Sequence, residues 1–341
     1  MPTPRSIVVV KLTSIGDVLH GVPVAVALKQ AFPEARIGWV VEGISADVLA
    51  GHPAIDHLFR LPRRWLESPR AVLDLRRQLR WFAADVAIDL QGLLKSGVAT
   101  WLSGAPMRVG FARPVSREQA WLAYTHRVKP GATHVVERNC ELLAPLGIRV
   151  AAPECAMPHW PVSRLRMQQY VASLRLPQPP VLLNPGAGWA SKRWPIERFA
   201  ATARALHRRR NQTTVVVWAG AAEHEMAERI AADSFGAAVV APSTTLQDLG
   251  ELCRLARLVI SGDTGPLHLA AAVGTPSVGL FGPVPAERNG PYGPQHACVE
   301  PPPALRPHWD DRKTDTLSMA GIEVERVVAA AEALLARSQA A

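Results

Sequence analysis

The chain has 341 residues, which is too many for one average domain and suits two. Hydrophobic residues make up 48% and charged residues 20% of it, as in a globular protein with sizeable cores. Its longest apolar runs fall far short of the roughly 20 residues that a membrane helix needs. The formal net charge of +9 favours acidic partners, namely nucleic acid, an anionic lipid surface or a phosphorylated substrate, without choosing among them.

The first apolar segment of the chain is Ile7–Val10. It is too short for the apolar core of a signal peptide and suits a first buried strand, so we expect a cytoplasmic protein. The four cysteines form no Cys-x-x-Cys pair and have no histidine cluster beside them, which argues against a disulfide framework and against a zinc site. The residues expected to be buried free thiols are Cys140, Cys155, Cys253 and Cys298.

Strands and helices alternate in the N-terminal half. The predicted strands are short apolar runs at Ile7–Val10, Ile37–Val41, Val86–Leu90 and Arg108–Phe111. The predicted helices are Val18–Ala31, Ala71–Phe82, Leu93–Leu102 and Val135–Leu146. A proline-rich stretch, 153–180, follows and is expected to hold a linker with one helix near Val162–Leu174.

The alternation starts again after this stretch. The predicted strands are Val181–Asn184, Thr214–Trp218, Val239–Val240, Leu258–Ile260 and Ser277–Phe281. The predicted helices are Ile196–His207, Ala222–Ser234, Leu246–Arg254, Leu267–Val273 and Val324–Leu335. Strand–helix alternation in both halves predicts an α/β fold with two parallel, doubly wound sheets. Ligands bind such sheets at the carboxyl ends of the strands, and with two facing domains the cleft between them is the default site.

The most informative stretch is Ser261–Ala272, where a predicted strand gives way to a helix of small residues. Gly262 and Gly265 flank an acid, Asp263, and a hydroxyl, Thr264. Free backbone N–H groups and the positive end of the helix dipole suit such a turn to a phosphate. Because a carboxylate repels phosphate, Asp263 is better explained as holding a sugar hydroxyl or a cation. The combination suggests a nucleotide-sugar.

The loop Asn184–Pro195 follows the first strand of the second half. It holds two glycines that free backbone amides, Gly186 and Gly188, and two cations, Lys192 and Arg193. It matches neither a P-loop nor a G-x-G-x-x-G fingerprint, and a flexible surface loop is the plain alternative. Clustered glycines and cations after a strand favour contact with an anion.

Three other polar residues of this half each have two interpretations. His268 lies in an otherwise apolar helix and is interpreted either as a packed core residue or as a ligand contact. Glu223 and Glu225 follow another predicted strand. They are interpreted either as first-turn acids of the next helix or as contacts to a ribose.

The segment Lys11–His20 follows the first strand of the chain and opens the first helix. Its acid, Asp17, is either a first-turn acid of the kind that helix N-termini favour or a general base aimed at an acceptor hydroxyl. Gly16 allows a ligand to approach closely, although turn geometry explains this glycine as well.

Between residues 60 and 80 the chain carries seven arginines against two acids. A solvated helix face explains the later arginines, but Arg63 and Arg64 lie in a proline-flanked loop and suit an acidic acceptor. The run carries no recognised nucleic-acid motif, so we expect no nucleic-acid partner. No Asp-x-Asp follows a strand, which disfavours a metal-dependent site; neither a metal ion nor another cofactor is expected.

Four motifs together resemble, in the same order, those of the lipopolysaccharide heptosyltransferases, glycosyltransferase family 9. They are Lys11–His20, Asp89–Ser96, Asn184–Pro195 and Gly262–Ala272, and the resemblance extends from about residue 6 to residue 335. Within the family, the chain is most similar to the enzymes that add the first heptose, through its Lys-Arg-Trp-Pro element and its basic N-terminal loop. The tail 306–319 departs from the pattern, because it lacks a cysteine that several relatives have and its Trp309–Lys313 sequence is unfamiliar.

The resemblance implies a GT-B fold, in which two Rossmann-like, doubly wound domains face a central cleft. The implied parts are an acceptor-binding domain at 1–160, a linker at 161–178, a nucleotide-sugar-binding domain at 179–320 and a C-terminal helix at 321–341 that packs back near the N-terminal domain.

By the same resemblance, Asp17 matches the catalytic base, and Lys192 matches the residue that meets the donor's phosphate and sugar. The other implied donor-binding residues are Gly186, Gly188, Glu225 (preferred over Glu223), Asp263, Thr264, Gly265 and His268. The implied acceptor-binding residues are Thr13, Ser14, Gly16, Arg63, Arg64, Gln91 and Lys95.

The implied function is an inverting transfer of L-glycero-D-manno-heptose from ADP-heptose to the Kdo sugar of Kdo-lipid A. Because that acceptor is an anionic glycolipid and the sequence has no spanning segment, we expect charge-driven, peripheral contact with the inner face of the cytoplasmic membrane. Two alternatives stay open: a related enzyme with another donor or acceptor, such as the second-heptose transferase or an epimerase, and a non-catalytic protein that binds nucleic acid or lipid through the basic run.

Overall fold

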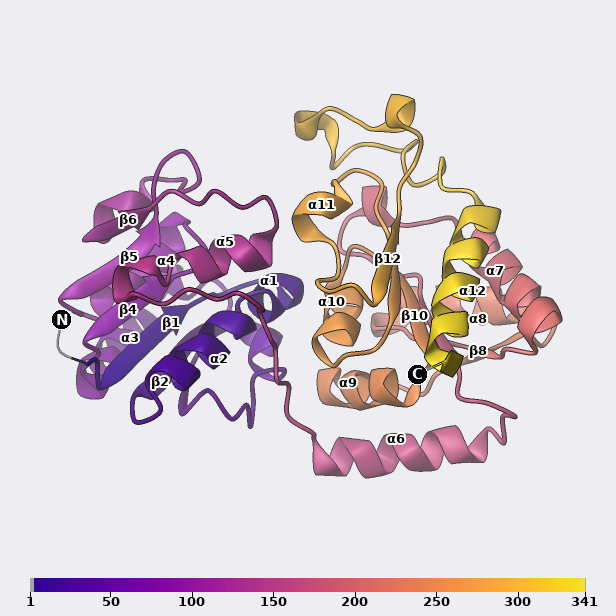
Figure 1. The fold of residues 1–341 in the computed structure, drawn as a ribbon, viewed down its shortest axis with the longest axis horizontal. Coiled ribbons are helices and arrows are strands. Elements are labelled where there is room, and N and C mark those ends of the chain that lie inside the picture. Colours follow the sequence, from indigo (N-terminus) through magenta and orange to yellow (C-terminus); the bar gives the residue numbers. More distant parts are fainter. Residues whose placement is uncertain (1–2, 341) are drawn as a thin grey trace. The chain divides into compact units, whose positions relative to one another are not determined.

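The computed structural model describes residues 3–340, with side chains as far as Arg337. The chain divides into two compact units, Met1–Pro158 and His159–Ala341. Each unit is built on one parallel sheet flanked by helices (Figure 1), so the predicted two-domain α/β fold is confirmed. Within residues 3–340, no helix is both long and apolar enough to cross a membrane.

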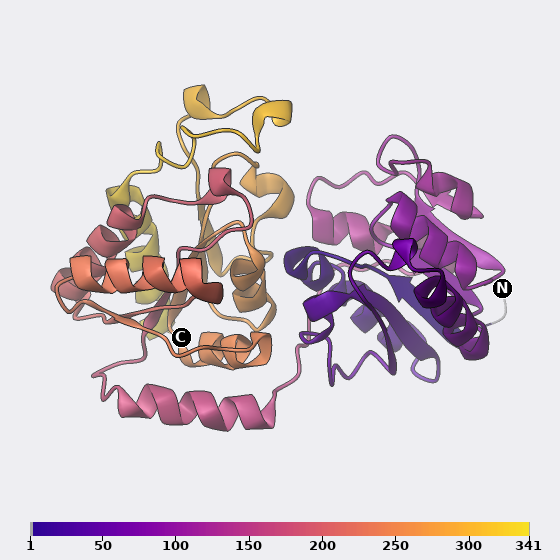
Figure 2. The ribbon, with the colours of Figure 1, turned by 180° about the vertical axis from the view of Figure 1, so that it is seen from behind.

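The sheet of the first unit has six strands in the order β3-β2-β1-β4-β5-β6, and neighbouring strands run parallel. The strands are β1 (Ser6–Val10), β2 (Arg36–Glu42), β3 (His57–Leu61), β4 (Val86–Asp89), β5 (Met107–Phe111) and β6 (His126–Val128). The helices are α1 (Ile15–Leu19), α2 (Val22–Ala31), α3 (Pro69–Phe82), α4 (Leu94–Leu102) and α5 (Val135–Glu141). Helices α3 and α4 cover one face of the sheet, and α2 and α5 cover the other (Figure 1, Figure 2).

Strand β1 shows why these residues form such a sheet. All of its residues are buried, and all but the first are Ile or Val. It lies between β2 and β4, where Ile7 pairs with Ile37 on one side and with Val86 on the other. A strand that is buried on both faces needs a continuous apolar run, and β-branched side chains suit its extended backbone.

The sheet of the second unit has six parallel strands in the order β12-β11-β10-β7-β8-β9. The strands are β7 (Val181–Asn184), β8 (Thr214–Val216), β9 (Ala238–Val240), β10 (Leu258–Gly262), β11 (Ser277–Leu280) and β12 (His296–Val299). The helices are α6 (Pro161–Ser173), α7 (Ile196–Arg210), α8 (Gly220–Asp233), α9 (Leu246–Leu255), α10 (Gly265–Ala272), α11 (Ala286–Asn289) and α12 (Val324–Ala340). Trp194, Phe199 and Ile322 are among the large side chains buried in its core.

Three strands that the sequence does not predict, β3, β6 and β12, lie at sheet edges. Edge strands are less covered, and polar residues such as Arg60 in β3 and Arg127 in β6 interrupt their apolar runs. The single helix predicted at 18–31 is two helices, α1 and α2. They are separated near Gly21, which packs so closely that an added Cβ would lie 2.9 Å from Leu90 Cδ1.

The segment 161–178, expected to be a linker, carries α6, the one helix predicted within 153–180, and α6 packs on α9. Arg166 Nη1 donates to Asp248 Oδ2 at 2.7 Å. The Trp160 N–H, just before α6, donates to Glu251 Oε1 at 2.8 Å. These contacts make α6 part of the second unit.

Helix α12 packs on α7 and β12 of the second unit. Its side chains Val327, Val328 and Ala331 are fully buried in the core of that unit. Its expected position near the N-terminal domain stays a prediction.

All four cysteines are free thiols. Cys140 and Cys253 are buried and Cys155 is half-buried, but Cys298 on the edge strand β12 is exposed, so the expected burial is wrong for Cys298. Burial raises the pKa of Cys253 to about 12, which keeps this thiol protonated and unreactive.

Candidate functional site

The turn after β10 holds a buried carboxylate, Asp263, between a lysine and a histidine. Lys192 Nζ donates to Asp263 Oδ2 at 2.5 Å, and His268 Nε2 lies 3.0 Å from Oδ1. Only 5% of the Asp263 side chain is exposed. Both carboxylate oxygens have partners within the protein, which is the condition for tolerating a buried charge.

The surroundings of Asp263 also set its charge state. Burial acts to raise its pKa, but the hydrogen bond and charge of His268 and the charge of Lys192 outweigh burial and hold the pKa below the ordinary value. Asp263 is therefore ionised at neutral pH. His268, interpreted from the sequence as a core residue or a ligand contact, is buried and fixes the position of this carboxylate.

A second set of hydrogen bonds joins this turn to the loop after β7. The Asn184 amide nitrogen donates to Ser261 Oγ at 2.9 Å and to Thr264 Oγ1 at 3.1 Å. Asn184 and Ser261 are paired in register on the neighbouring strands β7 and β10. A Cβ at Gly262 would lie 3.0 Å from the Lys192 carbonyl oxygen, so the two turns approach closely. The sheet topology thus brings two of the predicted donor-side motifs together.

The two adjacent cations of the loop 184–195 have different partners. Lys192 points to Asp263, and its Nζ lies 4.8 Å from the centre of the Trp189 ring. The Arg193 guanidinium donates to the Ala187 carbonyl at 3.2 Å, which closes the loop on itself. Lys192 is therefore the cation that this loop presents beside the N-terminus of α10.

The two glycines of this loop also differ. A Cβ at Gly186 would lie 2.2 Å from the Glu223 carboxylate, whereas no described atom lies within 4 Å of the corresponding position at Gly188. Glu223 Oε2 accepts from the Ala219 N–H at 2.9 Å, so Glu223 is a first-turn acid that also lies against the loop. Glu225, preferred from the sequence, is exposed on α8. Of the two acids, the structure places Glu223 at the loop.

In the first unit, Asp17 lies in α1 beyond the carboxyl end of β1. Its Oδ2 accepts from both the Ser14 N–H and the Ser14 hydroxyl, each at 3.0 Å, in a capping box. Its Oδ1 accepts no hydrogen bond from the residues that the structure describes, and the side chain is half-buried. Asp17 thus serves as a first-turn acid and still presents one carboxylate oxygen, so its two interpretations are compatible.

The turn after β4 contacts the segment that joins β1 to α1. Gln91 Oε1 accepts from the Leu12 N–H at 2.7 Å. Lys95 Nζ donates to Thr13 Oγ1 at 3.2 Å and to Glu42 Oε2 at 2.9 Å. Because β1 and β4 are neighbours in the sheet, three of the predicted acceptor-side residues, Thr13, Gln91 and Lys95, lie together.

Asp89, at the end of β4, shapes this turn from inside. It is fully buried and accepts from the Gln91 N–H at 2.8 Å, the Gly92 N–H at 3.1 Å and the Tyr124 hydroxyl at 2.7 Å. Burial raises the pKa of Asp89, while these hydrogen bonds oppose the rise. Asp89 therefore holds Gln91 in position and is not presented to a ligand.

The two predicted loop arginines lie just before the 3₁₀ turn η2 (Trp65–Glu67) and are exposed. Arg64 Nε pairs with Glu67 Oε1 at 2.8 Å. Within residues 3–340, no hydrogen bond or ion pair links Arg63 or Arg64 to the Asp17 turn.

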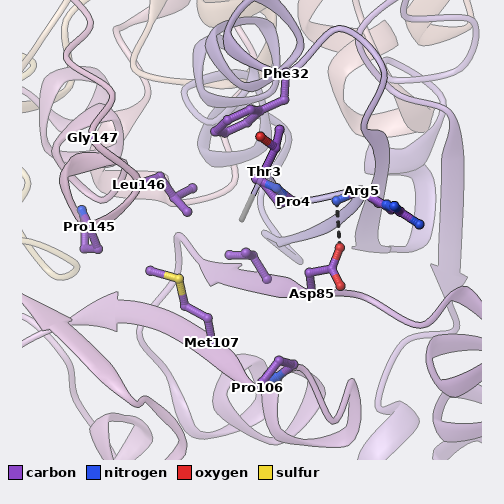
Figure 3. Close-up of a pocket in the computed structure, with 11 residues that line it drawn as sticks. Thr3, Pro4, Arg5, Phe32, Asp85, Pro106, Met107, Pro145, Leu146 and Gly147 are labelled. Carbon is purple, nitrogen blue, oxygen red and sulfur yellow. Dashed lines mark hydrogen bonds between the residues drawn. The ribbon is translucent and has the colours of Figure 1, made fainter. Parts of the chain in front are cut away.

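A separate hollow of about 840 Å³ lies at the opposite, amino edge of this sheet (Figure 3). Inside it, the Arg5 N–H donates to Asp85 Oδ2 at 2.7 Å. Its apolar lining consists of Pro4, Phe32, Val86, Pro106, Met107, Pro145 and Leu146. None of the predicted site residues lines this hollow.

Two residues of these sites were missed in the sequence, although each carries a signal. Glu42 ends the buried strand β2, which is a carboxyl-end position, and it pairs with Lys95. Trp189 lies between the glycines and the cations of the loop and holds Lys192 on its ring. In the described part of the chain, no group of three or more His, Cys, Asp or Glu side chains is arranged to hold a metal ion.

Comparison with known proteins decides the family. The model of glycosyltransferase family 9 (heptosyltransferase) matches residues 72–315. The chain belongs to glycosyltransferase family 9. This confirms the resemblance inferred from the four motifs, and it makes the protein a glycosyltransferase.

Individual relatives are similar over nearly the whole chain. Lipopolysaccharide heptosyltransferase 1 of Pseudomonas aeruginosa is 29% identical, and the alignment covers 96% of this chain and 98% of the relative. Two solved structures of the E. coli heptosyltransferase WaaC, one with ADP and one with ADP-2-deoxy-2-fluoro heptose, are 25% identical to this family 9 chain. Their TM-scores are 0.78 and 0.76, and the alignments cover 96% of this chain and 99% of theirs.

The buried pair makes a prediction about stability and pH. Because the folded-state pKa of Asp263 lies below its ordinary value of 3.8, its ionised form adds stability that is present above that value and is lost as pH falls through the folded-state pKa. Asp263→Asn leaves Lys192 without its counter-charge, and we expect the free energy of unfolding at neutral pH to fall by about 2–4 kcal/mol. We also expect the variant to lose less stability on acidification below about pH 5 than the unsubstituted protein.

Urea denaturation followed by circular dichroism over the acidic to neutral range measures both effects. Asp233→Asn, which changes an exposed acid at the end of α8, is the matched control and should leave stability nearly unchanged. Equal acid sensitivity of D263N and the unsubstituted protein would contradict the role given to the pair.

Proposed function

We propose that this enzyme transfers L-glycero-D-manno-heptose from ADP-heptose to the Kdo sugar of Kdo-lipid A, in the lipopolysaccharide inner core. The names of its relatives and the ADP and ADP-heptose analogue in the WaaC structures support this donor and this pathway. The observation that carries the proposal is the Lys192–Asp263 pair beside the N-terminus of α10. It combines a cation, a carboxylate and helix N–H groups, as a sugar diphosphate requires.

On the donor side, we assign the diphosphate to Lys192 and to the N–H groups at Thr264 and Gly265. Each oxygen of Asp263 already has one partner, but a carboxylate oxygen has a second lone pair that can accept from a heptose hydroxyl. Gly186 and Gly188 belong to the same loop as Lys192, and we assign their backbones to the donor site as well. The ribose is assigned to the acids of α8, with Glu223 placed better than Glu225.

On the acceptor side, the proposed site is the turn around Asp17. Thr13, Ser14 and Gly16 belong to the same turn as that acid. Gln91 and Lys95 contact this turn through the Leu12 N–H and Thr13 Oγ1. The Kdo sugar carries a carboxylate, which suits the ammonium of Lys95. The exposed loop arginines, Arg63 and Arg64, suit the phosphates of the lipid.

The reaction follows from these roles. Asp17 Oδ1 takes the proton of the acceptor hydroxyl while the hydroxyl oxygen attacks the anomeric carbon from the face opposite the diphosphate. The bond from that carbon to the phosphate oxygen breaks through an oxocarbenium-like transition state, and ADP leaves with the electron pair. Lys192 and the helix N–H groups stabilise the negative charge of the leaving ADP. The configuration at the anomeric carbon is inverted, and the step as proposed uses no metal ion or cofactor.

The base makes a direct prediction. Asp17→Asn keeps the size and the hydrogen bonds of the side chain but cannot take a proton, so we expect kcat for heptose transfer to fall by about 10²–10⁴. The dissociation constant for ADP should stay unchanged, because the proposed donor residues belong to the second unit. Transfer assays and calorimetric titration with ADP measure the two quantities.

Asp233→Asn again serves as the matched control and should retain full activity. Near-normal transfer by D17N would show that the base is another residue. Tight binding of a UDP-sugar without any response to ADP or ADP-heptose would instead favour the alternative enzyme with a different donor.

We also propose that the enzyme binds the inner face of the cytoplasmic membrane peripherally, through α3 and α4. These neighbouring helices expose large apolar side chains: Leu73 is 62%, Trp81 74% and Trp101 62% exposed. Tryptophan is favoured at the interface between lipid and water. Large apolar side chains exposed on two helices that contact each other suit an interaction surface.

The same layer is basic. Arg70, Arg76, Arg77 and Arg80 are exposed on α3. Arg80 extends from α3 to the end of α4, where its guanidinium occupies the space that a Cβ on Gly104 would need. Each arginine near an anionic bilayer contributes about 1 kcal/mol to binding, so the charge complements the lipid as the apolar side chains do.

Co-sedimentation with vesicles containing phosphatidylglycerol tests this surface. Arg76→Gln/Arg77→Gln should weaken binding by roughly 30-fold and make it less sensitive to salt. Trp81→Ser/Trp101→Ser should weaken binding at every salt concentration. Phe235→Ser, which removes a side chain that is 85% exposed on the second unit, is the control and should have no effect. Binding that ignores both salt and anionic lipid content would contradict the proposal.

A further inference from the structure

The tail 306–319, which departs from the family's sequence pattern, is held against the second unit. At its start, Arg306 Nη2 pairs with Glu300 Oε2 at 3.0 Å. In its middle, the Trp309 ring lies 5.1 Å from the guanidinium of Arg288 in α11. At its end, Met319 is buried in the core of the unit. These contacts fix the course of the tail, so the positions of its other side chains are informative.

One of those side chains, Lys313, reaches the proposed donor loop. Its Nζ lies 5.1 Å from the centre of the Trp189 ring. Lys192 Nζ lies 4.8 Å from the centre of the same ring. The distance between the two ammonium nitrogens therefore cannot exceed the sum of these two distances. A diphosphate and its neighbouring sugar can span that separation.

At the proposed donor site, the positive charge of Lys192 does not balance the negative charge of a sugar diphosphate. Lys192 is 2.5 Å from the Asp263 carboxylate, so much of its charge is already matched. Lys313 is exposed and forms no ion pair with any residue of the described chain. A sugar diphosphate carries two negative charges, and the departing ADP gains another. Its phosphate oxygens need more positive charge than Lys192 and a helix N-terminus supply.

We propose that Lys313 is a second cation for the donor's diphosphate and acts beside Lys192. The inference rests on the proposed function, because it concerns the same donor site. Trp189 contacts both ammonium groups through its ring. An anion that contacts both ammonium groups relieves their mutual repulsion, so binding is favoured by both contacts. Lys313 would touch the substrate itself and would also stabilise the leaving ADP.

The test compares ligands with and without phosphate. Lys313→Gln should weaken ADP binding roughly tenfold in calorimetric titrations, because one charge-assisted contact to phosphate is lost. The same variant should bind adenosine, measured by NMR titration, as the unsubstituted enzyme does. Lys313→Arg keeps the charge and should restore most of the affinity for ADP.

The neighbouring cation provides the control. The Arg312 guanidinium lies 4.1 Å from the centre of the Trp309 ring rather than on Trp189, so Arg312→Gln should leave ADP affinity within about twofold. Equal ADP affinity in K313Q and the unsubstituted enzyme would overturn the inference and leave the proposed function intact. An equal loss in R312Q would also overturn it, since the order of the tail and not the charge would then matter. Failure of the unsubstituted enzyme to bind ADP or ADP-heptose would overturn the proposed function itself.

Discussion

The contact between Asp263 and Lys192 is the constraint on which the second unit's site depends. The carboxylate is buried, and it is stable there only because Lys192 and His268 both contact it. Lys192 belongs to the loop after β7, and Asp263 belongs to the turn after β10. One ion pair therefore ties two motifs together and aims the lysine at the N-terminus of α10. Without the carboxylate, the ammonium group would keep only the Trp189 ring and a backbone carbonyl as partners within the described chain.

Sheet topology makes this pairing possible, and the first unit uses the same principle. Neighbouring parallel strands end at the same edge, so the turns that follow β7 and β10 meet, as do those that follow β1 and β4. The two units use the acid differently. Asp263 is enclosed and has partners on both oxygens, whereas Asp17 keeps one oxygen presented. The first arrangement suits binding and charge balance, and the second suits proton transfer.

Structure could be predicted best from the sequence where the burial and geometry of a residue depend on its neighbours along the chain. The central strands are continuous apolar runs because both of their faces are covered, and they were predicted nearly to the residue. The edge strands β3, β6 and β12 were missed because exposure lets polar residues into them. The turns were located correctly because glycines, acids and hydroxyls at the ends of strands are a local signal. The family followed from four such signals in order.

What could not be predicted are the partners of side chains. Nothing near Lys192 in the sequence shows that it contacts Asp263, and nothing near Lys95 points to Glu42, because both pairs depend on which strands are neighbours. The family resemblance favours Glu225 over Glu223 as the donor contact. In the structure the course of α8 directs Glu223 to Gly186 and leaves Glu225 exposed. Lys313 lies in a tail without any local pattern, so its position on Trp189 could be seen only in the folded chain.

The most direct test of this account is to identify the product. The purified enzyme would be incubated with ADP-heptose and either Kdo-lipid A or the same lipid already carrying one heptose, and the lipids would be analysed by mass spectrometry. We predict that Kdo-lipid A gains a single heptose while ADP is released, and that the heptosylated lipid is not extended. Transfer to the heptosylated lipid alone would contradict the acceptor assignment. Transfer from another sugar nucleotide but not from ADP-heptose would contradict the proposed function.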